Sequence, residues 1–359
     1  MVGLDLEAGT VAATEIQANG SVRVTGAGVV PLPSGVIREG EVVDPEQLTA
    51  ALKRLFAENN LSKTVRLGIA NQRVVVRTLQ LPALEKREEI ETAIRFQAQD
   101  QIPMPLEQAS MEWQVIERTT GASGEATMEV IVVAARREMV SSLVGAMRKA
   151  GLQPVGIDLS AFGMIRALVR ESGALDALPS YEERMAGLGD GAEAPMPAAM
   201  YCNLGDATNL AVARGGTCLF TRVAQFGVEG IAQRLSERAG LTLEHSRQWL
   251  VHVGLTDPVE GIEGDPETIA ATREVLGDGA LKLVDELRLS LEYYGAQDLA
   301  AAVETIVACG IGTTIPGLTE RVERELGRPV TAPRPQALGH LDNATAARLT
   351  LSYGLAVEG

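Results

Sequence analysis

Three residues of a turn near the start of the chain, Asp5, Gly9 and Thr10, have the chemistry of a phosphate-binding site. The turn joins two apolar runs with strand-like alternation, at residues 2–6 and 11–16. Because glycine has no side chain, backbone N–H groups of such a turn can approach phosphate oxygens closely, and the threonine hydroxyl adds a donor. The Asp5 carboxylate can hold Mg²⁺ through a water molecule. The turn therefore predicts a phosphate-binding hairpin.

A second turn of the same kind opens the other half of the chain. Asn203 aligns with Asp5 of the first turn, and Thr208 aligns with Thr10. Gly205 lies between them and supplies the small residue. Repeats that span half a chain imply two related lobes facing a cleft. Either turn alone could be an ordinary hairpin, but their match favours two phosphate-binding hairpins across one cleft.

A third glycine-rich segment follows a strand-like run at residues 305–308. Gly310 and Gly312 come after this run, and a helix is expected from Gly317. Such a segment can hold a nucleotide base and ribose against the backbone. The alternative is a dinucleotide-binding fingerprint, which requires a third glycine at a fixed spacing and an early strand–helix–strand unit. The chain has neither, so the first interpretation is preferred.

The elements around these turns predict an α/β protein with several domains, because 359 residues exceed the usual size of one. The expected divisions are a first lobe at 1–80 and 152–172, an insertion domain at 81–151, a mobile Gly- and Pro-rich connector at 173–197, a second-lobe core at 198–240 and 300–359, and a helical subdomain at 241–299.

Several helices are expected from capping and periodicity. Asp44 can cap a helix at 44–59. An amphipathic helix is predicted at 85–101, with Ile90 and Ile94 on one face and Phe96 roughly opposite. Two separate helices are predicted at 268–276 and 280–294, the second with leucines at four-residue spacing.

Composition excludes some classes of function. The net charge is −15 and the pI about 4.8, so the surface repels phosphate backbones and anionic lipid, which argues against nucleic-acid binding and direct membrane adhesion. No signal peptide is recognised, and no apolar run approaches the ~20 residues of a membrane helix. Cys202, Cys218 and Cys309 lie in apolar strand-like runs, which indicates reduced core thiols of a cytosolic protein. No cysteine or histidine has zinc-site spacing.

In this order, the three segments resemble the phosphate-1, phosphate-2 and adenosine motifs of the actin and sugar-kinase superfamily. Within it, the chain is similar to the family of type IV pilus assembly protein PilM, which is related to the cell-division protein FtsA. The resemblance is carried by Leu81-Pro82 before a helix ending at Ile102-Pro103, by the run 132–136, and by the run from Glu286 to Tyr294.

The resemblance implies a two-lobed actin-like fold with an FtsA-like insertion domain in the first lobe, and ATP or ADP with Mg²⁺ in the interlobe cleft. Glu244 and Arg247 match the family's Glu-x-x-Lys helix, which reaches the nucleotide's sugar and base. The nucleotide-binding residues carried over are Asp5, Gly9, Thr10, Asn203, Gly205, Thr208, Glu244, Arg247, Gly310 and Gly312, with Asp5 holding Mg²⁺ through water. No catalytic residue is identified, and at most a weak ATPase is expected.

The resemblance also implies a cytoplasmic scaffold at the inner face of the cell membrane. Its partners would be the cytoplasmic tail of a PilN-like membrane protein and pilus motor or alignment-complex components, with a homo-oligomer as a further possibility. The tail is expected to enter between the insertion and the first lobe, near Phe96, Asp100, Gln101 and Pro103. The alternative for Phe96 is that it packs against the neighbouring lobe.

The departures from the family pattern fall at the phosphate site. Glu7 and Asn203 stand where Gly and Asp are common, Cys309 replaces a glycine of the adenosine motif, and Ala12 replaces a lysine. A carboxylate ~4 Å from a phosphate charge costs about 4 kcal/mol, roughly a thousand-fold in affinity, unless something compensates. We therefore expect the cleft to be a structural or regulatory pocket.

Two other functions remain open from the sequence. A small-molecule kinase of the same superfamily would need a positioned catalytic carboxylate and a sugar-binding set, and neither is recognised. An FtsA-like filament-forming protein would carry an amphipathic membrane helix after the last helix predicted at 344–355, and none is recognised there.

Overall fold

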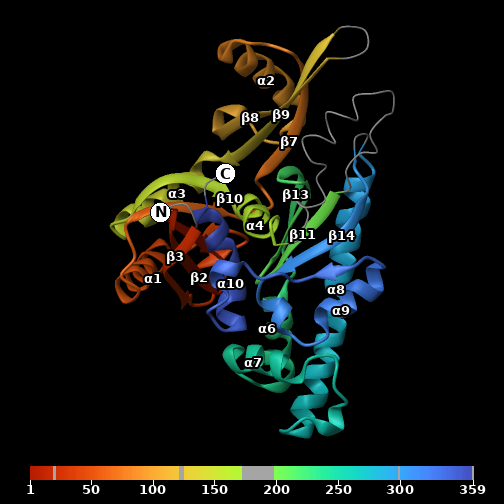
Figure 1. Ribbon diagram of the computed structural model, residues 1–359. Coiled ribbons are helices and arrows are strands. Elements are labelled where there is room, and N and C mark those ends of the chain that lie inside the picture. Colours follow the sequence, from red (N-terminus) through yellow and green to blue (C-terminus); the bar gives the residue numbers. More distant parts are fainter. Residues whose placement is uncertain (19–21, 121–124, 172–197, 298–299, 358–359) are drawn as a thin grey trace.

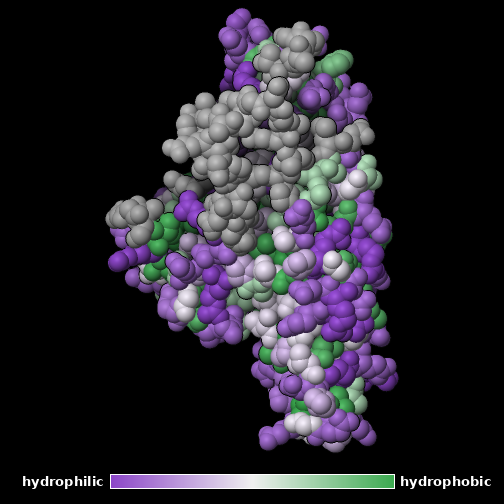
Figure 2. All heavy atoms as spheres, turned by 45° about the vertical axis from the view of Figure 1, so that its right-hand side comes forward, coloured by the Kyte–Doolittle hydropathy of each residue, from purple (hydrophilic) through white to green (hydrophobic). Residues whose placement is uncertain are grey.

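The computed structural model describes residues 1–18, 22–120, 125–171, 198–297 and 300–357. Figure 1 shows two lobes, each built around a sheet, and a smaller insertion that projects above the first lobe. The predicted connector at 173–197 lies outside the described residues. Hydrophilic side chains dominate the lower part of the second lobe in Figure 2, as the net charge of −15 leads one to expect.

The first lobe is built on a mixed five-stranded sheet. Its strands, in sheet order, are β10 (Gln153–Leu159), β6 (Thr64–Ile69), β1 (Val2–Leu6), β2 (Thr10–Ala18) and β3 (Val22–Pro31). The neighbours β1 and β2, and β2 and β3, are antiparallel, whereas β6 is parallel to both β1 and β10. A two-stranded hairpin, β4 (Ile37–Arg38) and β5 (Glu41–Val42), follows β3.

The second lobe repeats this arrangement strand for strand. Its sheet runs β13 (Thr217–Ala224), β12 (Thr208–Arg214), β11 (Ala198–Leu204), β14 (Val303–Cys309) and β15 (Val330–Thr331). β11 and β12 are antiparallel, as are β12 and β13, and β14 is parallel to β11 and β15. In both lobes three residues join the first two strands, so the internal repeat predicted from the two turns is present.

Helices cover the two sheets. The first lobe carries α1 (Pro45–Glu58), α3 (Arg137–Lys149) and α4 (Ser160–Leu168), and the second carries α6 (Val228–Ala239), α7 (Leu243–Val253), α8 (Pro266–Gly295) and α9 (Leu318–Leu326). Asp44 caps α1 as predicted, because its carboxylate accepts the backbone N–H groups of Glu46 and Gln47 at 3.1 and 3.0 Å.

The insertion is a three-stranded antiparallel sheet with one helix. Its strands lie in the order β7 (Val75–Pro82), β9 (Ala126–Arg136) and β8 (Ala109–Thr120), and α2 (Arg87–Gln101) packs on them. Ile90 and Ile94 are buried in this core, on the helix face predicted for them. The division at 81–151 also includes α3, but Met139 and Leu143 of α3 lie in the first-lobe core with α1.

The expected break between helices 268–276 and 280–294 is wrong, because α8 is one helix of 30 residues. The interval between the two predicted helices contains Gly277 and Gly279, and each glycine in a helix costs about 1 kcal/mol relative to alanine. A Cβ at Gly279 would lie 2.6 Å from Ile231 of α6. The glycine therefore permits close helix packing, and tertiary contact overrides the local propensity.

The last helix, α10 (Asn343–Ala356), packs on the first lobe although residues 300–359 were expected in the second-lobe core. A Cβ at Gly354 would collide with the backbone oxygen of Gly163 in α4, so the two helices approach closely. Thr14 of β2 and Ser352 share a buried hydrogen bond of 2.7 Å. Figure 1 shows α10 between the two sheets, where it links the lobes.

The three cysteines are buried and free, as predicted. Among the described residues, no helix combines the length and the apolar content needed to span a membrane.

Candidate functional site

The two predicted hairpins, at residues 7–9 and 205–207, meet across the lobes. The backbone N–H of Gly9 donates to Asp206 Oδ2 at 2.6 Å. In the opposite direction, Asn203 Nδ2 donates to Glu7 Oε1 at 2.8 Å. Each hairpin therefore supplies a carboxylate that accepts a hydrogen bond from the other lobe, and the lobes are joined by reciprocal hydrogen bonds.

Asp5 lies at the end of β1, where its side chain is 4% exposed. Its Oδ1 accepts a hydrogen bond of 2.8 Å from Ser160, the first residue of α4. Burial is the main cause that raises the pKa of Asp5 from 3.8 to about 6. The Ser160 hydrogen bond opposes this shift, and the charge of Asp206 adds to it.

The other carboxylates of the hairpins are also shifted upward. Burial raises the pKa of Glu7 well above its ordinary value, and the charges of Asp206 and Asp5 raise it further. Burial likewise raises the pKa of Asp206, with a contribution from Glu229 and an opposing one from the Gly9 hydrogen bond. These groups repel one another, and the site disfavours further negative charge.

Arg247 of α7 lies against Gly9 of the first hairpin and is already paired, and Arg348 of α10 is a second cation whose charge acts on Glu7 and Asp206. Its Nε and Nη2 donate to both carboxylate oxygens of Glu229 at 2.9 and 2.6 Å, and its Nη1 donates to Glu244 at 3.1 Å. Burial lowers the pKa of Arg247, but Glu229, with smaller contributions from Glu244 and Asp206, more than offsets this and leaves the pKa raised. A Cβ placed on Gly9 would lie 2.8 Å from Arg247 Nη2, so the guanidinium covers the hairpin.

The predicted adenosine segment lies beside Asn203. Gly310 has a φ of +85°, and a Cβ there would collide with Asn203 Oδ1, so both backbone angle and space require glycine. Gly312 packs on Leu204 of β11. Thr208 does not face the cleft, because its hydroxyl donates to the carbonyl of Phe226 at 2.7 Å.

The residues at the hairpins do not fit a bound nucleotide with Mg²⁺. The cavity between the hairpins, lined by Asp5, Glu7 and Asp206 among others, has a volume of ≈ 100 Å³. Pockets for cofactor-sized ligands have about 300–1,000 Å³. Among the described residues, no group of three or more His, Cys, Asp or Glu side chains is arranged to hold a metal ion. Asn209 lines this cavity, and its buried Nδ2 has no hydrogen-bond partner among the described residues, but it is one donor among carboxylates.

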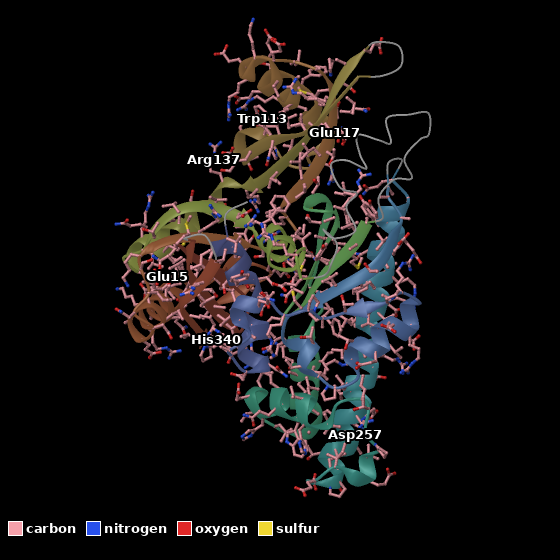
Figure 3. The ribbon with its side chains drawn as sticks, viewed as in Figure 1. Glu15, Trp113, Glu117, Arg137, Asp257 and His340 are labelled. Atoms are coloured by element: carbon pink, nitrogen blue, oxygen red, sulfur yellow. The ribbon has the colours of Figure 1, made fainter. Side chains whose placement is uncertain are left out.

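Larger hollows lie elsewhere, and one of ≈ 290 Å³ is lined by Gly310 of the adenosine segment. Two others lie away from the hairpins and share Ile69 and Leu159. One, of ≈ 560 Å³, lies between the insertion and the first lobe; we call it the insertion groove. The other, of ≈ 790 Å³, lies between β7 and the second-lobe elements β13 and α8. Arg137 lies at the base of the insertion, beside the first of these hollows (Figure 3).

The predicted partner-binding residues are not gathered in one place. Phe96 is 76% exposed and lines neither hollow, so it also does not pack against the neighbouring lobe. Asp100 and Gln101 are exposed at the end of α2, and Pro103 lines the larger hollow. The neighbour of Phe96, Arg95, is the α2 residue that lines the insertion groove.

Three site residues were missed by the sequence reasoning: Ser160, Asp206 and Glu229. Asp206 was detectable, since it lies inside the second turn itself. Glu229, on α6, and Ser160, on α4, follow strands in sequence but carry no local motif. Their approach to the hairpins is a product of tertiary packing.

Two sheets of one topology, joined at paired hairpins, define a protein of the actin-like class. Two solved structures share this fold. The ethanolamine utilization protein EutJ from Carboxydothermus hydrogenoformans has 13% identity and a TM-score of 0.55, covering 100% of this chain and 89% of that one. MreB5 of Spiroplasma citri bound to ADP has 13% identity and a TM-score of 0.50, covering 98% and 94%.

The chain belongs to the family of type IV pilus assembly protein PilM, whose model matches residues 3–351. It is also similar to a solved structure described as a PilM-PilN type IV pilus biogenesis complex. There the identity is 24% and the TM-score 0.77, over 99% of this chain and 97% of that one. The predicted actin-like fold and PilM family are thus confirmed.

Proposed function

We propose that this protein is a cytoplasmic scaffold of the type IV pilus machine that captures the N-terminal tail of a PilN-like inner-membrane protein. Membership of the PilM family and similarity to the PilM-PilN structure support this proposal. In this proposal the protein reaches the inner face of the membrane through that partner. The protein performs no chemical step in this role.

The observation that carries the proposal is the position of the insertion groove between two sheet edges. β8 is an outer strand of the insertion sheet, and β10 is an outer strand of the first-lobe sheet. Residues 109–112 of β8 and 157–159 of β10 line the groove. Outer strands have unpaired backbone groups that can bind an extended peptide as an added strand.

The side chains of the groove suit an extended peptide with apolar residues. Leu106, Met111, Val133 and Phe162 supply apolar surface, and Arg95, Glu112 and Arg137 supply charges of both signs. Arg137 Nη2 donates to the carbonyl of Ala109 at 3.1 Å, which satisfies one acceptor at the end of β8. In an added strand, alternate side chains of the tail would enter this apolar surface.

Other surfaces remain for further partners. Phe96, exposed on the opposite side of α2 from Ile94, is an aromatic anchor of the kind that interfaces favour, so we assign it to motor or alignment-complex components. A homo-oligomer would use surfaces outside the insertion groove. ATP or ADP with Mg²⁺ is not part of the proposed function, because the hairpin residues do not fit it.

The tail proposal is tested with a fluorescent synthetic peptide of the N-terminal cytoplasmic residues of the PilN-like protein. We expect saturable binding that Met111→Glu weakens at least about tenfold, since a charge replaces an apolar contact in the groove. Phe96→Ala is the matched control, and binding should be unchanged. Absence of binding to the unaltered protein, or full binding by Met111→Glu with native circular dichroism, would rule the groove out.

A further inference from the structure

We propose that the interlobe cleft of this protein is self-liganded: the Asp206 carboxylate occupies the phosphate position of the first hairpin and keeps the lobes together without a nucleotide. This inference does not depend on the tail proposal. It concerns the hairpins at 7–9 and 205–207, whereas the tail would bind in the insertion groove.

The contact between Gly9 and Asp206 carries the proposal. A phosphate-binding turn presents backbone N–H groups to an anionic oxygen. Here the Gly9 N–H donates to a carboxylate oxygen of Asp206 at 2.6 Å, across the cleft. Asp206 is 9% exposed, so little water competes for this contact.

The second hairpin is covered in the same way from the other lobe. Glu7 extends over Gly205, because a Cβ at Gly205 would collide with Glu7 Oε1. The carboxylate is held there by Asn203 Nδ2 at 2.8 Å. Both turns that would approach a nucleotide phosphate therefore have a carboxylate of this chain over them.

The charges around the cleft also oppose an incoming phosphate. Asp5, Glu7 and Asp206 line the cavity between the hairpins. Two arginines act on these carboxylates: Arg247 binds both carboxylate oxygens of Glu229, and Arg348 of α10 does not line the cavity. A nucleotide would have to displace Asp206 from Gly9 and would gain no free arginine among the described residues that line this cavity. The cleft is therefore closed by the chain's own side chains.

Hydrogen–deuterium exchange of the segment around Gly9 tests this inference on the full-length protein. In the unaltered protein, the segment should exchange slowly without nucleotide, and millimolar ATP with Mg²⁺ should not change it. Asp206→Ala removes the acceptor and should accelerate exchange about tenfold or more. Asp206→Asn keeps an acceptor oxygen for Gly9 and should show a clearly smaller effect.

Two controls make the result decisive. Asp257→Ala removes an exposed carboxylate at the far end of the second lobe (Figure 3) and should leave the exchange unchanged. Circular dichroism verifies the fold of each variant, and Asp206→Asn serves if the alanine variant is misfolded. The proposal is overturned if ATP with Mg²⁺ slows exchange around Gly9 in the unaltered protein. It is also overturned if both Asp206 variants exchange like the unaltered protein.

Discussion

The cleft between the hairpins and the insertion groove differ in what fills them. The cleft is reduced to ≈ 100 Å³ and is lined by carboxylates that hydrogen-bond across the lobes. The insertion groove keeps ≈ 560 Å³ between two outer strands. One fold therefore contains a closed polar contact and an open groove with both apolar and charged side chains.

Because the cleft is closed by side chains of the protein itself, closure of the lobes does not depend on the concentration of a ligand. If a nucleotide held the lobes together, closure would depend on its concentration by mass action. An internal carboxylate is always present at the same effective concentration. The groove, in contrast, gains its occupant only from another molecule. Under the proposed function, the protein would then present one constant shape to a membrane partner.

The largest effect is expected when the cleft is reopened by substitution. In Glu7→Gly with Asp206→Ala, both hairpins lose their covering carboxylates. A single carboxylate near phosphate costs about 4 kcal/mol, roughly a thousand-fold, so affinity for ATP with Mg²⁺ should rise about a thousand-fold or more, as measured by calorimetry.

The control for this pair removes the same number of charges elsewhere. Glu15→Gln with Asp257→Asn changes two carboxylates that lie outside the cavity between the hairpins (Figure 3). This variant should bind ATP no better than the unaltered protein. If the cleft variant also shows no gain, the two carboxylates are not what excludes the nucleotide.

The second prediction uses the pKa of Asp5, which burial raises to about 6. Between about pH 4 and 6 the folded state binds more protons than the unfolded state, so the free energy of unfolding falls as pH rises through this window. Asp5→Asn removes this loss and keeps an acceptor for Ser160. Urea unfolding at pH 7 should show a gain of up to about 3 kcal/mol, with a smaller difference at pH 4.

Asp257→Asn, an exposed site, should show no such gain at either pH. A decrease in stability of Asp5→Asn at pH 7 would mean that the Asp5 charge is needed at the cleft. In that case Asp5 would act at the cleft as a charged hydrogen-bond acceptor rather than as a buried neutral acid.

The architecture was predictable because its signals are local and repeated. The two matching turns predicted the two lobes, and the alternation of apolar and polar residues and the helix-capping residues predicted most strands and helices. The break predicted within α8 and the assignment of α10 to the second lobe differ from the structure for a physical reason. Local sequence does not show that Gly279 and Gly354 each leave room for another helix to approach closely.

The candidate site was predictable only in part. Asp5, Gly9 and Asn203 are brought together as their positions in the two turns required. What local sequence could not show is that Asp206 reaches the opposite hairpin, or that Glu229 holds Arg247. Those contacts join residues that are 197 and 18 positions apart and depend on how the lobes and helices pack.

The smallest expected effect concerns Arg247. Its planar guanidinium binds Glu229 through two parallel hydrogen bonds, and a lysine ammonium cannot form this pair. Arg247→Lys should lower the free energy of unfolding by about 1 kcal/mol in urea unfolding, the net contribution of one hydrogen bond. Arg238→Lys is the matched control, because Arg238 of α6 pairs with Glu274 of α8 on the exposed surface, where ion pairs contribute about 0–1 kcal/mol. Equal effects at both arginines would mean that the pair of Arg247 and Glu229 adds no stability beyond that of a surface ion pair.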